Sequence, residues 1–142
     1  MNIEKLYNKI LVEARNPVIF SDFINDNLNN KILVFLIFLS KIFNNIDKNE
    51  RKYQIFFDYI FNRLETDLRE LGYGDMSVNK KMKVIVTKFY SILIDFKTFN
   101  NISNDQRHDI LIKYFLNIKK IEGFSNLIID YLSIDNVELN VN

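Results

Sequence analysis

Apolar residues recur at spacings of three and four along most of this 142-residue chain. One stripe consists of Tyr53, Phe57, Ile60, Phe61, Leu64, Leu68 and Leu71, and a second of Val78, Met82, Ile85, Phe89, Leu93, Phe96 and Phe99. This spacing places apolar side chains on one face of an α-helix. Because no stretch sustains an alternating apolar and polar pattern, the sequence predicts helices and no strands.

The pattern predicts an all-α fold of about six helices in one domain spanning residues 1–142. The expected helices are Ile3–Arg15, Asn30–Asn44, Lys48–Leu71, Ser77–Phe99, Asn104–Lys119 and Gly123–Leu132, with a short helical turn after Pro17. A chain of this length can bury a core without disulfides or metals. Residues 133–142 are expected to form a frayed tail.

Gly72 and Gly74, two of the three glycines, lie between the two strongest stripes. Glycine adopts a positive φ without steric penalty, so this Gly-x-Gly is expected to close one helix and turn sharply into the next. The two stripes would then pack as an antiparallel helix pair, the predicted scaffold of the bundle. Asp75 or Ser77 is expected to cap the second helix by accepting hydrogen bonds from its free N–H groups.

Composition and charge argue against several classes of protein. Without cysteine the chain has no disulfide and no thiolate chemistry, and one histidine, His108, expected at the surface, rules out a histidine metal cluster. Its 19 basic and 18 acidic residues leave a net charge of +1, so no global field attracts nucleic acid or an anionic membrane. No phosphate-binding loop and no nucleophile with an adjacent base is present. We therefore predict no enzyme activity, no cofactor and no metal.

Membrane insertion and export are not expected either. The most hydrophobic run, Ile32 to Leu39, is much shorter than the roughly 20 residues of a membrane span. The first fifteen residues mix charged and apolar positions, unlike a signal peptide. These observations predict a cytoplasmic protein.

Several charged residues can be interpreted in two ways. Arg69 and Glu70, with Asp67, could pin the corner or contact a partner, and pinning is favoured because charges in a last helical turn commonly pair locally. Arg15 could cap the first helix, which Pro17 ends, or meet a partner. A basic face that could touch RNA or membrane phosphates, or simply be solvated, is offered by Lys80, Lys81, Lys83 and Tyr90, with Lys88, Lys119 and Lys120 further along.

An ordered series of short motifs also marks the chain. They are Ala14-Arg15-x-Pro17, then Leu68-Arg69-Glu70-x-Gly72-x-Gly74-Asp75, then Ser77-Val78 with Lys80, Lys81 and Lys83, and finally Phe89-Tyr90. In these residues the chain resembles the ubiquinol-cytochrome c chaperone family, from about Tyr7 to Phe99. It departs from many members at Ser91-Ile92, where they have Gly-Arg, and in lacking a histidine in the apolar second helix.

The resemblance implies an assembly factor for the cytochrome bc1 complex that holds newly made cytochrome b. It also implies the ribosome or a small partner subunit as further contacts, with peripheral contact at the inner face of the cytoplasmic membrane and no role for DNA. The residues implied in partner binding are Arg15, Arg69, Glu70, Asp75, Lys80, Lys81, Lys83 and Tyr90.

Two other functional classes remain as alternatives. A helical module that binds RNA or the ribosome should present one contiguous lysine face with exposed aromatic side chains. An enzyme should present a pocket with convergent polar groups and perturbed pKa values. A chaperone should instead expose an apolar groove, for which the 13 phenylalanines and 7 tyrosines supply ample material.

Overall fold

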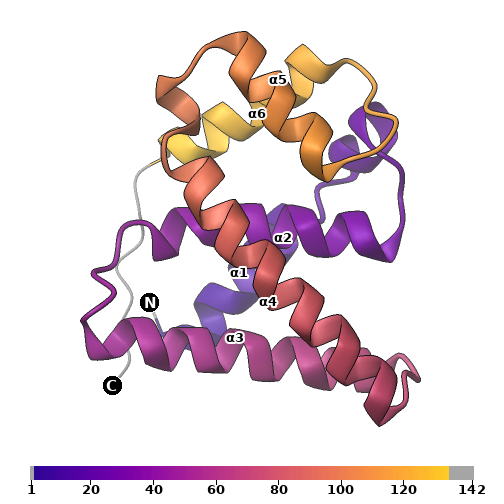
Figure 1. Cartoon of the computed structure of the whole chain (residues 1–142), viewed down its shortest axis with the longest axis vertical. Helices are drawn as coiled ribbons and strands as arrows, with labels where there is room; N and C mark the ends of the chain where they lie inside the picture. Colours follow the sequence, from indigo (N-terminus) through magenta and orange to yellow (C-terminus); the bar gives the residue numbers. More distant parts are fainter. Residues whose placement is uncertain (1, 135–142) are drawn as a thin grey trace.

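The computed structural model describes residues 2–134, which form six α-helices and no strand (Figure 1). The helices are α1 (Ile3–Ala14), α2 (Leu28–Phe43), α3 (Arg51–Glu70), α4 (Asp75–Lys97), α5 (Asn104–Tyr114) and α6 (Ile121–Ser133). A turn of π-helix, Ile19–Phe23, follows Pro17, and a 3-10 turn, Phe99–Asn101, follows α4. The all-α prediction is confirmed, and the tail predicted at 133–142 lies outside the described residues apart from its first two positions.

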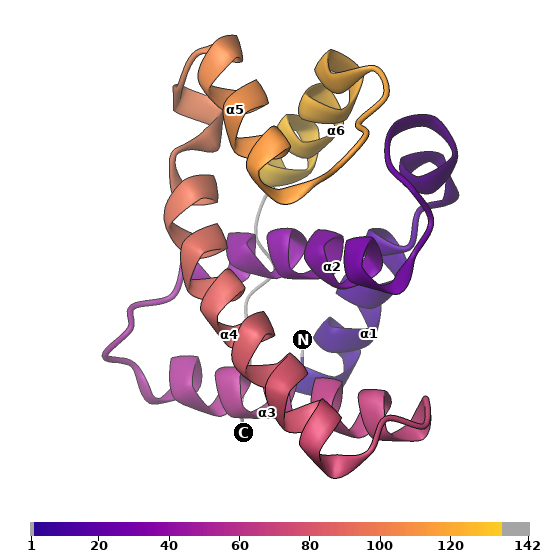
Figure 2. The ribbon, with the colours of Figure 1, turned by 45° about the vertical axis from the view of Figure 1, so that its right-hand side comes forward.

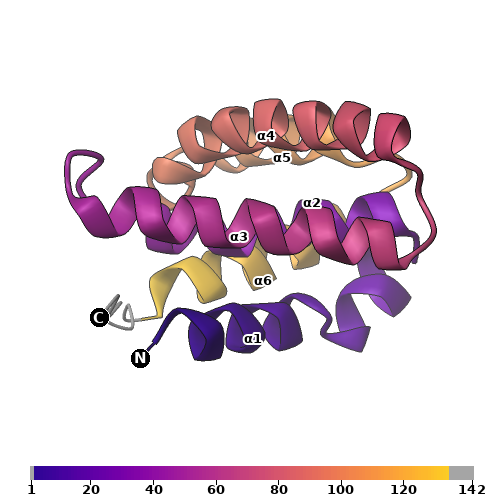
Figure 3. The ribbon, with the colours of Figure 1, turned by 90° about the horizontal axis from the view of Figure 1, so that it is seen from below.

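Helix α2 is the centre of the fold. Every residue from Leu33 to Phe43 is buried, because this run is apolar except for Ser40 and Lys41 and must be covered all round. In Figures 1 and 2, α2 lies between the pair α5 and α6 at one end of the molecule and α3 at the other. Figure 3 shows α1 and α4 on opposite sides of α2.

An aromatic cluster at the end of α2 joins three helices. The ring of Phe43 lies 5.0 Å from that of Phe56 in α3 and 5.2 Å from that of Phe89 in α4, and Phe61 of α3 also contacts Phe89 at 5.4 Å. Each such pair adds about 0.5–1.5 kcal/mol beyond the area it buries. The two predicted stripes therefore meet, but they do so around α2, and α4 runs back diagonally across both α3 and α2 (Figure 1).

The chain reverses between α3 and α4 through the two glycines. Gly72 has a φ of +97°, its N–H donates to the carbonyl of Arg69 at 3.0 Å, and the N–H of Tyr73 donates to that of Leu68 at 3.4 Å. This pair of bonds is the Schellman arrangement that ends a helix at a left-handed residue. The predicted cap is wrong, since Gly74 is the N-cap of α4 and no side chain caps it. Asp75 already lies in the first turn, where its carboxylate pairs with Arg69.

The fifth helix ends five residues earlier than predicted. After Tyr114 the backbone becomes extended at Phe115, which is buried against Phe124 of α6 with ring centres 5.4 Å apart. The N–H of Lys119 donates to the carbonyl of Phe23 at 2.7 Å, which holds the connection against the turn after Pro17. Asn117, in this connection, has a positive φ of 58°, a conformation that asparagine tolerates. Tertiary contacts thus override the helical pattern here.

Candidate functional site

A groove of about 850 Å³ opens between α2, α4 and α5. Its lining includes nine aliphatic side chains, namely Leu28, Ile32, Leu33, Leu36, Leu68, Val84, Ile85, Ile112 and Leu116. Leu33, Leu36, Leu68 and Ile85 are buried and form the floor, whereas Val84, Ile112 and Leu116 are exposed at the edges. The groove is therefore apolar at its base and carries projecting aliphatic side chains on both sides.

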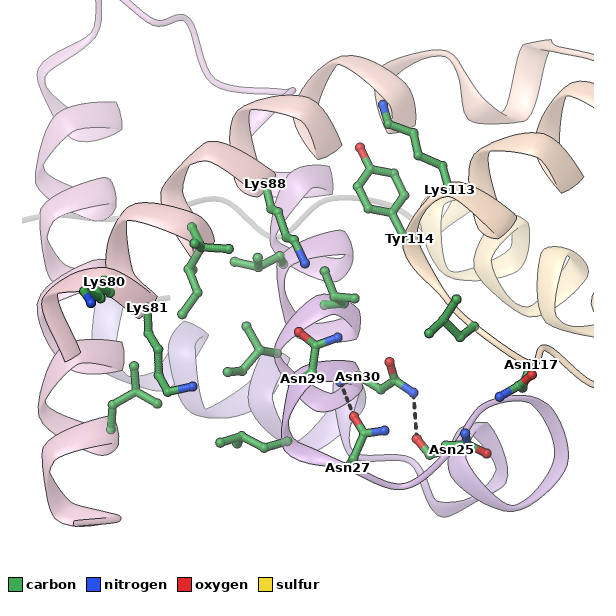
Figure 4. Close-up of a pocket in the computed structure, with 18 of the residues that line it drawn as sticks. Asn25, Asn27, Asn29, Asn30, Lys80, Lys81, Lys88, Lys113, Tyr114 and Asn117 are labelled. Atoms are coloured by element: carbon green, nitrogen blue, oxygen red, sulfur yellow. Dashed lines mark hydrogen bonds between the residues drawn. The ribbon is translucent and has the colours of Figure 1, made fainter. Parts of the chain in front are cut away.

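The polar part of the lining is basic. Lys80, Lys81, Lys88 and Lys113 line the groove, and no aspartate or glutamate among residues 2–134 does. Lys113 is compensated, because its ammonium lies 2.9 Å from the Asp95 carboxylate, and this hydrogen bond raises the pKa of Lys113. Within the described residues the other three make no ion pair, although the Lys81 ammonium lies 4.7 Å from the centre of the Tyr73 ring. Figure 4 shows Lys81 and Lys88 extending from α4 over the groove.

Asparagine side chains line the side of the groove opposite these lysines (Figure 4). Asn27 is the N-cap of α2 and accepts a hydrogen bond from the N–H of Asn30 at 2.9 Å. The Asn30 amide in turn donates to the carbonyl of Asn25 at 2.9 Å. These bonds hold the segment before α2 in place, and they leave this wall polar but uncharged.

A hydrogen-bonded network fixes α5 to α4 at the end of the groove. The Tyr114 hydroxyl donates to Asp95 at 2.6 Å and lies 2.6 Å from the Ser91 hydroxyl, to which Lys113 also donates at 3.0 Å. Burial and then the bond to Asp95 raise the pKa of Tyr114. Because this network holds the two helices together, it sets the width of the groove and the position of Ile112 and Leu116.

A second feature, which we call the outer stripe, consists of Met76, Tyr90 and Ile94 on α4. These side chains are exposed by 77%, 52% and 74% respectively. Tyr90 and Ile94 are four residues apart, and Met76 lies two seven-residue steps before Tyr90, so the three fall on nearly the same side of the helix. Lys83 lies on this side as well, and the Tyr90 ring stacks on Phe57 of α3 at 6.1 Å. The outer stripe is thus an exposed surface with three apolar side chains beside the pair α3 and α4.

The predicted basic face is divided between these two features. Lys80 and Lys81 line the groove, whereas Lys83 and Tyr90 do not. The contiguous lysine face with exposed aromatic side chains, which an RNA-binding module requires, is therefore not formed by these residues. Lys88 also lines the groove. It follows Lys81 by seven residues, which is about two helical turns, and this spacing in the sequence could have predicted that the two lysines share one side of α4.

The charged residues of the corner are mostly satisfied by one another. Arg69 donates to Glu65 at 2.9 Å and also pairs with Asp75, and these hydrogen bonds raise the pKa of Arg69. Asp67 does not join them, because it accepts a hydrogen bond from the Tyr7 hydroxyl of α1 at 3.1 Å. Glu70 is exposed and makes no ion pair with the described residues. The geometry of Arg69 and Asp75 therefore agrees with the favoured interpretation, in which charged side chains pin the corner.

Arg15 and His108 lie away from the groove. Arg15 is the exposed C-cap of α1, and its backbone N–H donates to the carbonyls of the last turn. It borders a small cavity of about 100 Å³ between α1, α2 and α3. His108 was expected at the surface, but it is half-buried, and its Nε2 atom is buried without a hydrogen-bond partner. Packing of α5 against the rest of the molecule, which the local polar sequence does not reveal, covers this ring.

None of the helices within residues 2–134 is both long and apolar enough to cross a membrane. In the same range, no three histidine, cysteine, aspartate or glutamate side chains are grouped so that they could hold a metal ion.

The profile of one protein family, described as Ubiquinol-cytochrome C chaperone, matches residues 30–108. The match covers 79 of the 142 residues, counted from 30 through 108, and so more than half of the chain. The chain belongs to the ubiquinol-cytochrome C chaperone family. The matched region contains the corner, the outer stripe and the three uncompensated lysines, whereas Ile112 and Leu116 lie beyond it. No curated protein and no solved structure matches the chain.

Proposed function

We propose that this protein is an assembly factor of the cytochrome bc1 complex (ubiquinol-cytochrome c reductase) that binds newly made cytochrome b. The observation that carries the proposal is the family match over residues 30–108, which spans nearly all of α2 and all of α3 and α4. The proposed role is that of a passive binding protein without catalysis. It shields apolar segments of its client from water until the other subunits bind.

The outer stripe of α4 is the proposed client surface. Met76, Tyr90 and Ile94 expose apolar side chains along a helix that is held against α2 and α3, for example by the hydrogen bond from the Asn44 side chain to the Leu93 carbonyl at 3.1 Å. An exposed apolar strip of this kind fits the apolar face of a partner helix. It also lies wholly within the matched residues.

The groove suits this client less well. Cytoplasmic loops of membrane proteins carry an excess of lysine and arginine, and Lys80, Lys81 and Lys88 would repel them. Two lysines, Lys83 and Lys97, lie on the same side of α4 as the outer stripe, against three uncompensated lysines in the groove. We therefore assign the client to the outer stripe, and place the protein on the cytoplasmic side of the membrane, where a newly made membrane subunit and the ribosome are both accessible.

Deletion of the gene in the native organism tests the proposal. Assembled cytochrome b, measured by its haem spectrum in membranes, and ubiquinol-cytochrome c reductase activity should fall, while other respiratory complexes remain. The wild-type gene should restore both. Normal bc1 levels in the deletion strain would refute the proposed function.

Complementation with variants tests the client surface. Met76→Glu with Ile94→Glu should fail to restore bc1 levels although the protein accumulates and melts normally, because both side chains are exposed, by 77% and 74%. Val12→Glu is the matched control, since Val12 is 73% exposed on α1, away from the outer stripe, and this variant should restore bc1 fully. If both variants restore bc1 equally, the client binds another surface of the protein.

A further inference from the structure

Three positive charges in the groove have no counter-charge in the described part of the protein. Four carboxylates near its lining have partners elsewhere, since Asp26 pairs with Lys31 at 3.1 Å and Asp95 with Lys113 at 2.9 Å. Asp67 is bound by the Tyr7 hydroxyl, and Asp75 pairs with Arg69. Lys80, Lys81 and Lys88 therefore line the groove from one helix, α4, and no carboxylate of the described residues neutralises them. The charge pattern indicates an anionic occupant.

Aliphatic side chains project beside these lysines on both edges of the groove. Val84 on the α4 edge is 54% exposed, and Ile112 and Leu116 on the α5 edge are 61% and 79% exposed. Ile112 lies in the last turn of α5, and Leu116 lies two residues after its end at Tyr114. Lysines flanked by protruding aliphatic residues suit the interfacial region of a bilayer, where ammonium groups meet phosphates and apolar side chains reach the acyl chains.

We infer that the groove between α2, α4 and α5 binds the anionic phospholipids of a membrane surface. Lys80, Lys81 and Lys88 contact lipid phosphates, and Ile112 and Leu116 enter the interface. The inference goes beyond the proposed function and does not depend on it, because lipid binding by the purified protein is measurable without cytochrome b.

Aliphatic rather than aromatic edges distinguish this site from a nucleic-acid site. Single-stranded RNA is held by stacking on free aromatic rings. The two tyrosines of the groove are not free for stacking, since Tyr73 lies beneath the Lys81 ammonium and Tyr114 is held by Asp95 and Ser91. A lipid surface needs no such rings and uses the exposed Ile112 and Leu116 instead.

Cosedimentation of the full chain with lipid vesicles tests the inference. Binding to vesicles of phosphatidylcholine mixed with phosphatidylglycerol should be strong and should fall as salt rises from about 0.1 M to about 1 M, because the lysine contacts are screened. Binding to phosphatidylcholine alone should be weak. Equal binding to both vesicles would overturn the inference.

Charge variants locate the site. Each lysine near an anionic surface strengthens partitioning about fivefold, so the triple variant Lys80→Gln, Lys81→Gln and Lys88→Gln should lower it about a hundredfold. The control with the same net charge replaces exposed lysines elsewhere, Lys5→Gln, Lys48→Gln and Lys97→Gln. If both triple variants lose binding equally, the attraction is a property of net charge and the groove is not the site.

Ile112→Ser with Leu116→Ser should lower binding about tenfold without changing its salt dependence, because apolar insertion is lost and the charges remain. Val12→Ser is the control and should bind as the wild type does. All variants should keep the wild-type circular dichroism and melting temperature, which separates loss of binding from unfolding.

Competition identifies the ligand. Millimolar inorganic phosphate, short single-stranded RNA and an acidic peptide should each leave vesicle binding nearly unchanged, because none offers both a charged surface and an apolar phase. Displacement by phosphate would reduce the groove to a simple anion site and overturn the membrane assignment. Displacement by RNA or by the peptide would overturn it in favour of that partner.

Discussion

The corner between α3 and α4 and the basic flank of α4 lie a few residues apart and both carry several charged side chains, but they differ in how charge is balanced. In the corner, Asp67 is bound by Tyr7 of α1, and Arg69 is bound by Glu65 and Asp75. On the flank, Lys80 and Lys88 have no ion pair within the described residues. The corner's main charges therefore serve the fold, whereas those of the flank are available to a partner.

The largest effect on stability should come from the backbone of the corner. Gly72 has a φ of +97°, and a methyl group on its Cα would meet no other atom within 4 Å, so Gly72→Ala should lower the free energy of unfolding by about 1–2 kcal/mol through strain alone. Gly74 has a φ of −72°, and Gly74→Ala should cost less than about 1 kcal/mol. Urea unfolding of the two variants measures both. Equal losses would show that the turn does not depend on a left-handed residue.

Tyr7→Phe should cost about 1 kcal/mol at neutral pH, because it removes the hydrogen bond to Asp67. Burial, followed by the negative charge of Asp67, raises the pKa of Tyr7 above its ordinary value of 10.0. A raised pKa in the folded state means that this contribution is complete below about pH 10 and is lost as pH rises above it. The variant should therefore show a shallower loss of stability above pH 10, as thermal melts across that range would reveal.

Arg69→Ala and Asp75→Ala should each produce a small loss of stability that diminishes with added salt, since the pair is exposed. A double-mutant cycle should show that the two losses are not additive. If Arg69 instead contacted a partner, its replacement would reduce bc1 assembly without any change in melting temperature. Such a result would mean that the corner, like the flank, is a binding surface.

The smallest effect on stability should come from the flank itself. Replacing Lys80, Lys81 and Lys88 with glutamine should leave the melting temperature unchanged, or raise it slightly at low salt, because three like charges are removed and no ion pair is broken. Differential scanning calorimetry at low and high salt measures this. A clear loss of stability would mean that these lysines serve the fold as the corner charges do, and the comparison would fail.

Local sequence was enough to predict the helices, the corner and the family. A period of 3.6 residues marks the buried face of each helix, and only glycine readily takes the φ that Gly72 adopts, so these features depend on local chemistry. The motif from Leu68 to Asp75 carried the family resemblance, and it lies within the matched residues 30–108. The predicted end of α5 was wrong because Phe115 packs on Phe124, a contact that local periodicity does not encode.

Which charges are balanced, and what surrounds the groove, depends on packing between helices. Helical spacing tells which side chains share a face, but not which helix lies opposite that face. Thus Lys80 and Lys81 were expected with Lys83, yet the position of α2 and α5 separates them from it. Lys113 is neutralised by Asp95 from another helix, and the asparagine wall comes from a segment about fifty residues before the lysines of α4. A groove is a property of the gap between elements, and the packing of three helices is what creates that gap.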